Sequence, residues 1–252
     1  MRIIHKRSVF QLTFLPRFFP VNAYLVEEED GLTVIDAGLP YSAKGILQAA
    51  ARIGKPITRI ALTHAHGDHI GALDALKAAL PQVPVFVSAR DARLLAGDRS
   101  LYAHEPQDPI RGDVPKAGKI KTKADVLLQD GDRVGSLLAI SAPGHTPGHM
   151  AFLDTRNRAL LAGDALQTRG GMAVAGQLRP LFPFPAMATW NKVASLATAR
   201  KLCELNPSLL GVGHGLMVDN PKAQIARAIE TAERRLHANA EEGSNQDAAH
   251  RS

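Results

Sequence analysis

The stretch THAHGDH at 63–69 carries the strongest structural signal in the chain, and it continues the apolar run RIALT at 59–63, with which it shares Thr63. Such a run is typical of a buried strand. Imidazole nitrogens and carboxylate oxygens are ligands of zinc and similar divalent ions. A chain that leaves a strand can direct His64 and His66 to one point, while Asp68 and His69, where a helix begins, can face a second point. The stretch therefore predicts a metal site at the end of a strand.

Three further polar residues occur in the same setting, each after an apolar run and beside a glycine. They are His145 in APGHTPGH, Asp164 in LLAGDA and His214 in GVGHG. Each residue alone is compatible with a turn or with a buried, hydrogen-bonded histidine. Four strand ends can meet only if they share one edge of a sheet, so these residues and 63–69 together predict a single metal-binding cluster.

Short runs rich in Val, Ile and Leu alternate with helical patterns along the chain, which is typical of an α/β protein. We expect one domain over 1–240 and a polar, frayed tail at 241–252. The region 96–123, which has several prolines and no periodicity, predicts a long surface loop without an assigned role. Strands are predicted at 22–28, 32–36, 59–63, 83–88, 125–128, 137–142, 150–154, 159–163 and 209–213, and helices at 41–53, 67–80, 189–205 and 221–240.

Composition and charge exclude several classes of protein. A chain of 252 residues that is 45% hydrophobic can bury a large core, and its one cysteine excludes an intramolecular disulfide framework. The net charge of +6 is compatible with an acidic partner, but the basic stretch at 111–123 contains no aromatic residue that could stack on bases. We therefore expect no nucleic acid partner. No apolar run resembles a signal peptide or a membrane span, so a cytoplasmic protein without a membrane partner is expected.

With HxHxDH followed by a His, an Asp and a His at strand ends, the sequence resembles the metallo-β-lactamase superfamily. The resemblance covers nearly the whole chain, from NAYLVEE at 22–28 to GHG at 213–215. It implies an αββα sandwich built from two similar halves, with the metal site at one edge between two mixed sheets. It also implies a ligand set in which His64, His66 and His145 hold a first ion, Asp68, His69 and His214 hold a second, and Asp164 bridges them.

The resemblance and the ligand chemistry together predict an enzyme, a metal-dependent hydrolase with two divalent ions. Two such ions that share a water can lower its pKa from about 15.7 toward neutrality, which makes a bridging hydroxide available as the nucleophile. Asp68 could orient this water or pass on its proton, and is the expected catalytic residue. Zinc is the expected metal, although iron and manganese suit the same ligands.

Two further residues are expected beside the ligands. Asp36, in LTVIDAGL, stands at another strand end, where it either accepts a hydrogen bond from a ligand histidine or caps a turn or helix. His149 completes GHTPGH and is expected to support the site rather than to act as an eighth ligand.

Differences between this sequence and particular branches of the superfamily narrow the range of expected substrates. Asp164 is the bridging carboxylate of the thioesterase, lactonase and phosphodiesterase branches, which disfavours β-lactamase activity. Too few residues follow His214 for the glutathione-binding domain of glyoxalase II, so a glutathione thioester is disfavoured. The tyrosine that acyl-homoserine lactonases carry after the bridging aspartate is absent from GDALQTRGG at 163–171. A lactonase that works without this phenol is still compatible with the sequence.

Two apolar loops, LTFLPRFFP at 12–20 and the segment 170–190, indicate a small-molecule substrate with an apolar part. A small carboxylic ester, thioester or lactone fits this expectation. Packing within the sandwich, or at the contact of a homodimer, explains each apolar side chain equally well, and the sequence leaves the oligomeric state open. The side chains predicted to line a pocket are Phe18, Phe19, Met172, Phe182 and Phe184.

Two alternatives use the same fold. RNA-processing relatives hydrolyse phosphodiesters with the same seven ligands, and the charge of +6 suits them, but the sequence lacks an aromatic and basic stripe. Persulfide dioxygenases bind a single iron, here through His64, His145 and Asp164, and would make the chain an oxidoreductase.

Overall fold

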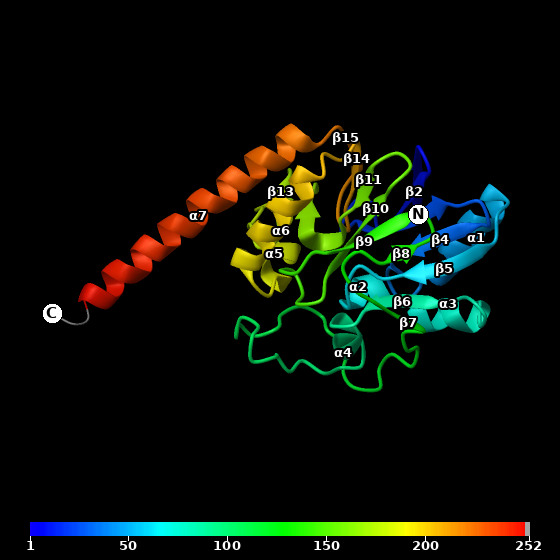
Figure 1. Cartoon of the computed structure of the whole chain (residues 1–252), viewed down its shortest axis with the longest axis horizontal. Coiled ribbons are helices and arrows are strands. Elements are labelled where there is room, and N and C mark those ends of the chain that lie inside the picture. The colour runs from blue at the N-terminus through cyan, green and yellow to red at the C-terminus, as the bar shows by residue number, and fades with distance from the viewer. Residues whose placement is uncertain (250–252) are drawn as a thin grey trace.

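The computed structural model describes the backbone of residues 1–249 and the side chains of residues 1–238. Two β-sheets pack face to face, and helices cover the outer face of each sheet (Figure 1). This αββα arrangement confirms the fold class predicted from the sequence. A separate two-stranded ribbon joins β12 (Leu166–Gln167) to β13 (Ala173–Val174).

The first sheet has seven strands in the order of the sequence. β1 to β4 form an antiparallel meander, and β4 to β7 pair in parallel. Ile35 of β4 pairs with Ala61 of β5, so Asp36 and the stretch 63–69 leave the sheet at the same edge. The strands are β1 (Arg2–Lys6), β2 (Val9–Phe14), β3 (Val21–Glu27), β4 (Leu32–Ile35), β5 (Ile57–Ala61), β6 (Val85–Ser88) and β7 (Val126–Leu128).

The second sheet has the order β15-β14-β11-β10-β9-β8, and only the pair β11–β14 is parallel. Leu161 of β11 lies opposite Gly211 of β14, so Asp164 and His214 follow their strands at one edge. The strands are β8 (Arg133–Val134), β9 (Leu137–Ser141), β10 (Met150–Asp154), β11 (Ala159–Leu161), β14 (Leu209–Gly211) and β15 (Val218–Asp219).

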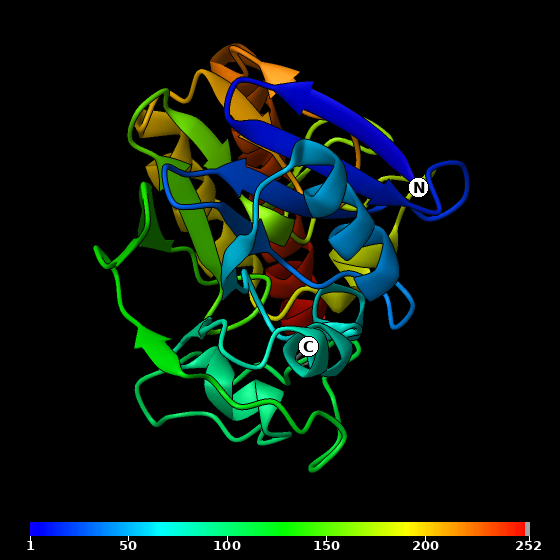
Figure 2. The same ribbon diagram turned by 90° about the vertical axis from the view of Figure 1, so that its right-hand side faces the viewer.

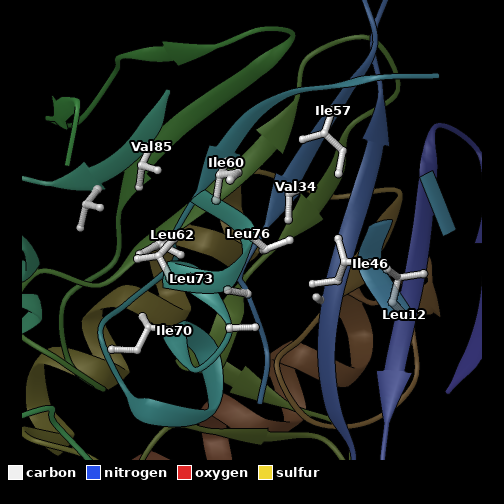
Figure 3. Close-up of a cluster of buried hydrophobic side chains, with 14 of the residues drawn as sticks. Leu12, Val34, Ile46, Ile57, Ile60, Leu62, Ile70, Leu73, Leu76 and Val85 are labelled. Carbon is white, nitrogen blue, oxygen red and sulfur yellow. The ribbon is translucent and has the colours of Figure 1, made fainter. Parts of the chain in front are cut away.

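Three apolar clusters hold these layers together. One lies between the sheets and includes Tyr24 and Phe152. A second joins the first sheet to α1, α2, α3 and α4, with Ile46 and Leu73 among its members (Figure 3), and α1 and α3 face the viewer in Figure 2. A third joins the second sheet to α6 and α7. Each large aliphatic side chain buried in this way contributes about 1.5–3 kcal/mol of transfer free energy. The helices are α1 (Ala43–Ile53), α2 (Gly67–Ile70), α3 (Leu73–Ala79), α4 (Asp91–Leu95), α5 (Phe184–Ala188), α6 (Lys192–Glu204) and α7 (Lys222–Ala249), with a 3₁₀ turn at Gly163–Ala165.

The structure corrects the sequence prediction at several elements. The hairpin β1–β2 was not predicted, because β1 is a largely exposed edge strand and β2 buries the polar Gln11, so neither shows a clear alternation. The helix predicted at 67–80 is split between α2 and α3. The chain turns at Gly71, whose N–H donates to the Gly38 carbonyl and whose missing side chain makes room for Pro40.

Helix α7 is longer than predicted. It continues to Ala249 and so includes most of the tail at 241–252 that was expected to be frayed; residues 250–252 lie outside the described residues. Alanine, glutamate and glutamine favour the helix in this stretch, whereas Gly243, Ser244, Asn245 and Asp247 disfavour it. α7 extends away from the sandwich (Figure 1). No helix among the described residues is long and apolar enough to cross a membrane.

Candidate metal centre

The seven side chains predicted as metal ligands meet at the edge between the two sheets. Within each of three groups, the potential ligand atoms lie within 4.8 Å of one another. All seven side chains are nearly inaccessible except Asp68, whose side chain is 22% exposed. Because the groups share His64 and His69, they are neighbours within one cluster. The groups are His64, His66 and His145; His64, His69 and Asp164; and Asp68, His69 and His214.

Asp164 lies between the two sides of this cluster. Its Oδ2 is 3.4 Å from His145 Nε2 and 3.2 Å from His214 Nε2, and its Oδ1 is 3.5 Å from His69 Nε2. One carboxylate therefore contacts histidines of both outer groups.

Several polar atoms that face this point lack a hydrogen-bond partner among the described residues. They are His64 Nε2, His69 Nε2 and Asp164 Oδ1, and all three are buried. A buried polar atom without a partner costs about 1–3 kcal/mol. Imidazole nitrogens and carboxylate oxygens are donors that zinc, iron and manganese accept. The residues present therefore fit divalent metal ions.

The carboxylates make one side of the cluster strongly attractive to positive charge. Burial lowers the pKa of His214, but Asp164 and Asp68 outweigh burial and raise it to about 10. The pKa of His69 is also raised, against burial, by the same two carboxylates. Burial lowers the pKa of His64 well below its ordinary value. A cation at Asp164 and Asp68 is thus electrostatically favoured, whether it is a proton or a metal ion.

Asp36 orients one of the histidines. Its Oδ2 lies 2.8 Å from His69 Nδ1, and its two oxygens accept hydrogen bonds from the Thr63 hydroxyl and N–H, each at 2.7 Å. The sequence left open a cap or a histidine contact, and the structure shows the histidine contact. Because His69 Nδ1 faces Asp36, His69 Nε2 faces the cluster.

His149 is buried beside the cluster but belongs to none of the three ligand groups. Its Nε2 accepts a hydrogen bond from the Asp164 N–H at 3.1 Å, and its ring stacks on that of His64. Burial lowers the pKa of His149 to about 3, so the ring is neutral at physiological pH. His149 therefore holds the backbone that carries Asp164.

We expect His149→Ala to lower metal affinity or activity by about 10- to 100-fold, the usual cost of losing a group that orients a metal ligand. Metal should still bind to this variant at saturating metal concentration. His149→Gln is the matched variant, because its side-chain oxygen can accept the same N–H, and it should recover part of the loss. Elemental analysis and metal titration of the two variants measure this. Complete loss of an ion from His149→Ala would show that His149 is itself a ligand.

The segment that carries His214 is held by buried polar side chains of the first sheet, which sequence reasoning missed. Gln11, Asn22 and Tyr24 donate hydrogen bonds of 2.6–2.8 Å to carbonyl oxygens on either side of His214. The Pro20 carbonyl lies 2.7 Å from His214 Nδ1, which directs Nε2 to the cluster. The signal available in the sequence was the presence of polar residues within the otherwise apolar strands β2 and β3.

Asp91 is a second residue that the sequence did not single out. It is fully buried and accepts hydrogen bonds from the Ala65 N–H, the Gly148 N–H and the Thr146 hydroxyl. Burial raises its pKa to about 6. Asp91 thereby ties the stretch 63–69 to the loop that follows β9. Its local sequence is an ordinary helix start and gives no sign of this role.

The loop at 96–123, which had no predicted role, covers one side of the cluster. The Arg111 carbonyl oxygen lies 3.0 Å from His66 Nε2. The next residue, Gly112, has φ +82°, and a Cβ there would lie under 3.0 Å from the His66 ring. Only glycine allows the loop to pass this close.

A cavity of about 430 Å³ opens onto the cluster. One wall is apolar and comes from the turn before β3 and from α5, which include two of the predicted pocket residues, Phe19 and Phe184. Sequence reasoning did not assign the other members of this wall to the pocket. They are Pro185, Met187 and Ala188.

Three of the five predicted pocket residues do not line this cavity. Phe18 is 83% exposed, although it shares one turn with Phe19, which lines the cavity. Phe182 is buried behind the wall, with its ring centroid 5.2 Å from those of Phe19 and His214. Met172 packs against the apolar cluster of the second sheet.

Known proteins resemble this chain in sequence and in fold. The model of the metallo-beta-lactamase superfamily matches residues 16–214, a range that contains all seven predicted ligands. The uncharacterized protein YobT of Bacillus subtilis (strain 168) is 54% identical, over 93% of this chain and 100% of its own length. The probable metallo-hydrolase YflN of the same organism is 31% identical, over 77% of this chain and 80% of its own length.

Two further similarities concern a named enzyme and a solved structure. A hydroxyacylglutathione hydrolase of Rhodopseudomonas palustris (strain BisB18) is 30% identical, over 83% of this chain and 72% of its own length. The crystal structure of TTHA1623 in a di-iron-bound form is similar with a TM-score of 0.61 at 30% identity, over 84% of this chain and 96% of that one.

Proposed function

Because the chain belongs to the metallo-β-lactamase superfamily and is a metal-dependent hydrolase, we propose that it holds two divalent ions and hydrolyses small carboxylic esters, thioesters or lactones with an apolar part. Zinc is the proposed metal. The observation that carries the proposal is the position of Asp164, whose two oxygens contact histidines on both sides of one buried cluster.

The ligand assignment follows the three groups. His64, His66 and His145 would hold the first ion, Asp68, His69 and His214 the second, and Asp164 both. Two divalent ions bound there would lower the pKa of a shared water and polarise the carbonyl group of a substrate. The buried, unpartnered atoms of His64, His69 and Asp164 support this assignment, because each would gain a partner.

Asp68 is the group that can orient a water in the cavity. Its side chain is 22% exposed, more than those of the other six predicted ligands, and it lines the cavity. Burial raises the pKa of Asp68, but His69 and His214 outweigh burial and lower it. Asp68 is therefore ionised at neutral pH and can accept a hydrogen bond from water, which would orient that water.

The cavity supports a carbonyl substrate over a phosphodiester. Its volume of about 430 Å³ suits a small molecule. Among the described residues, no Lys or Arg lines it, so a phosphate backbone would find no basic partner there. The wall formed by Phe19, Phe184 and Met187 suits an apolar acyl group.

Elemental analysis of protein purified without added metal tests the proposal, together with a panel of ester, thioester, lactone, β-lactam and phosphodiester substrates. We expect two zinc ions per chain and turnover of one or more carbonyl substrates. Activity should disappear with a chelator and return on addition of zinc. One iron per chain without hydrolysis would overturn the proposal in favour of the dioxygenase, and turnover of phosphodiesters alone would overturn the substrate class.

A further inference from the structure

The cavity contains one charged side chain that is not a predicted metal ligand, the carboxylate of Asp113. Although the chain carries a net charge of +6, its nearby basic residues border other hollows of the described surface. Arg111 and Lys192 border a groove next to α5. Arg99, Lys116 and Lys119 border a hollow beyond Gly67, which Asp113 also lines, but none of these basic residues lines the cavity itself. The charge that a bound molecule meets in the cavity, apart from the metal cluster, is therefore negative.

Asp113 is held beside the metal-binding stretch. Its carbonyl oxygen accepts a hydrogen bond of 2.8 Å from the Gly67 N–H. Its carboxylate lies directly over Gly67, where a Cβ would come under 3.0 Å from Oδ2. Gly67 stands between the predicted ligands His66 and Asp68. The absence of a side chain at Gly67 thus makes room for a carboxylate between the cavity, which Asp113 lines, and the neighbouring hollow, which Gly67 and Asp113 both line.

Aromatic rings also line the cavity. Phe19 and Phe184 lie with their ring centroids 5.1 Å apart at 69°. The face of an aromatic ring attracts a cation. A carboxylate such as that of Asp113 can form an ion pair with the same cation. A second carboxylate would be repelled by Asp113 and would gain nothing from the rings. The cavity lining therefore combines groups that favour an ammonium ion and disfavour an anion.

We propose that Asp113 is a specificity-determining residue, which selects substrates that place an ammonium or hydroxyl group against it and rejects those that place a carboxylate there. The substrate class is then a cationic or uncharged ester, thioester or lactone. The inference rests on the proposed function for the bond that is broken, whereas the charge preference is a property of the cavity. A carboxylate that entered could also bind the metal ions directly, and Asp113 opposes this.

Binding of matched amides to the metal-loaded protein tests the inference without turnover. Three alkyl amides of equal length that end in a methyl, an ammonium or a carboxylate group serve as probes, and calorimetry gives their Kd values. Asp113→Asn should weaken binding of the ammonium amide about fivefold and strengthen binding of the carboxylate amide about fivefold, which is the scale of one exposed ion pair. The methyl amide should be unaffected. Asp113→Lys should shift both charged amides further in the same directions.

Glu29→Gln is the control, because it changes the net charge equally. Glu29 is exposed in the turn between β3 and β4, at the end of the sheet opposite to the ligands. It should leave all three Kd values unchanged. The inference would be overturned if the ratio of the Kd values of the ammonium and carboxylate amides were the same in Asp113→Asn as in the unmodified protein.

The results that would contradict the proposed function differ from those that would contradict the role of Asp113. If Asp113→Asn shifts the amide ratio while the protein hydrolyses no carbonyl substrate, the role of Asp113 is supported and the proposed function is wrong. If esters are hydrolysed, charged ester analogues should show the Asp113→Asn effect in KM rather than in kcat, since Asp113 is placed to contact the bound molecule and not the metal ions.

Discussion

The Asp164→Ala protein is expected to hold fewer than two metal ions per chain and to lose hydrolytic activity by about two orders of magnitude or more. Asp164 is the residue whose oxygens contact His69, His145 and His214 together, so its removal affects both proposed ion sites at once. The fold should remain, because the Asp164 side chain lies at the edge of the sandwich and not in an apolar cluster. Elemental analysis, activity and a thermal melt of the same preparation test all three statements.

Asp164→Asn is the companion variant. It keeps the shape of the side chain and one oxygen, but it removes the negative charge that attracts the ions. It should retain more metal than Asp164→Ala and still lose most of the activity, since a neutral amide bridges two cations poorly. A fully active Asp164→Ala protein with two ions per chain would contradict the ligand assignment.

Gly213→Ala is expected to produce the second largest effect. A Cβ at this position would lie 2.6 Å from His69 Cε1 and even closer to Asp164 Oδ1. The backbone cannot easily retreat, because the Gly213 N–H donates to the Gly163 carbonyl and the Gly213 carbonyl accepts from the Asn22 N–H, each at 2.9 Å. The added methyl group must therefore displace the ligands. A displacement of about 1 Å can cost about 100-fold in rate, and overpacking costs about 1–3 kcal/mol of stability.

The measurement for Gly213→Ala is metal content together with kcat/KM and Tm. Gly118→Ala is the control, because a Cβ there meets nothing within 4 Å and the position has φ +74°, so it carries a backbone cost without a contact. Gly118→Ala should keep two ions and full activity. Normal metal content and normal activity in Gly213→Ala would show that the ligands accommodate a side chain that the structure does not allow.

The fold class could be predicted from the sequence because its signals are local. THAHGDH follows an apolar run, and His145, Asp164 and His214 each stand where a short strand ends beside a glycine. A strand end fixes both the position and the direction of the residues that follow it. The structure accordingly brings all seven predicted ligands within one cluster.

The pocket could not be predicted in the same way. Phe18 and Phe19 are identical neighbours in the sequence, yet one is 83% exposed and the other lines the cavity. The turn in which both N–H groups donate to the Leu15 carbonyl decides this difference. Asp91 likewise acts through contacts with residues far along the chain. Periodicity along the sequence carries no information about such contacts.

The hydrogen bonds from Gln11, Asn22 and Tyr24 to the segment around His214 link the beginning of the chain to its last third. During synthesis the strands that carry these three residues leave the ribosome long before His214 exists. A nascent chain can therefore present His64, His66 and His69 without the residue that completes the cluster. Since metal binding is coupled to folding, uptake of two ions at the proposed sites would require docking of the second sheet on the first. Ions bound at the proposed sites would then be retained only by chains whose two halves have assembled.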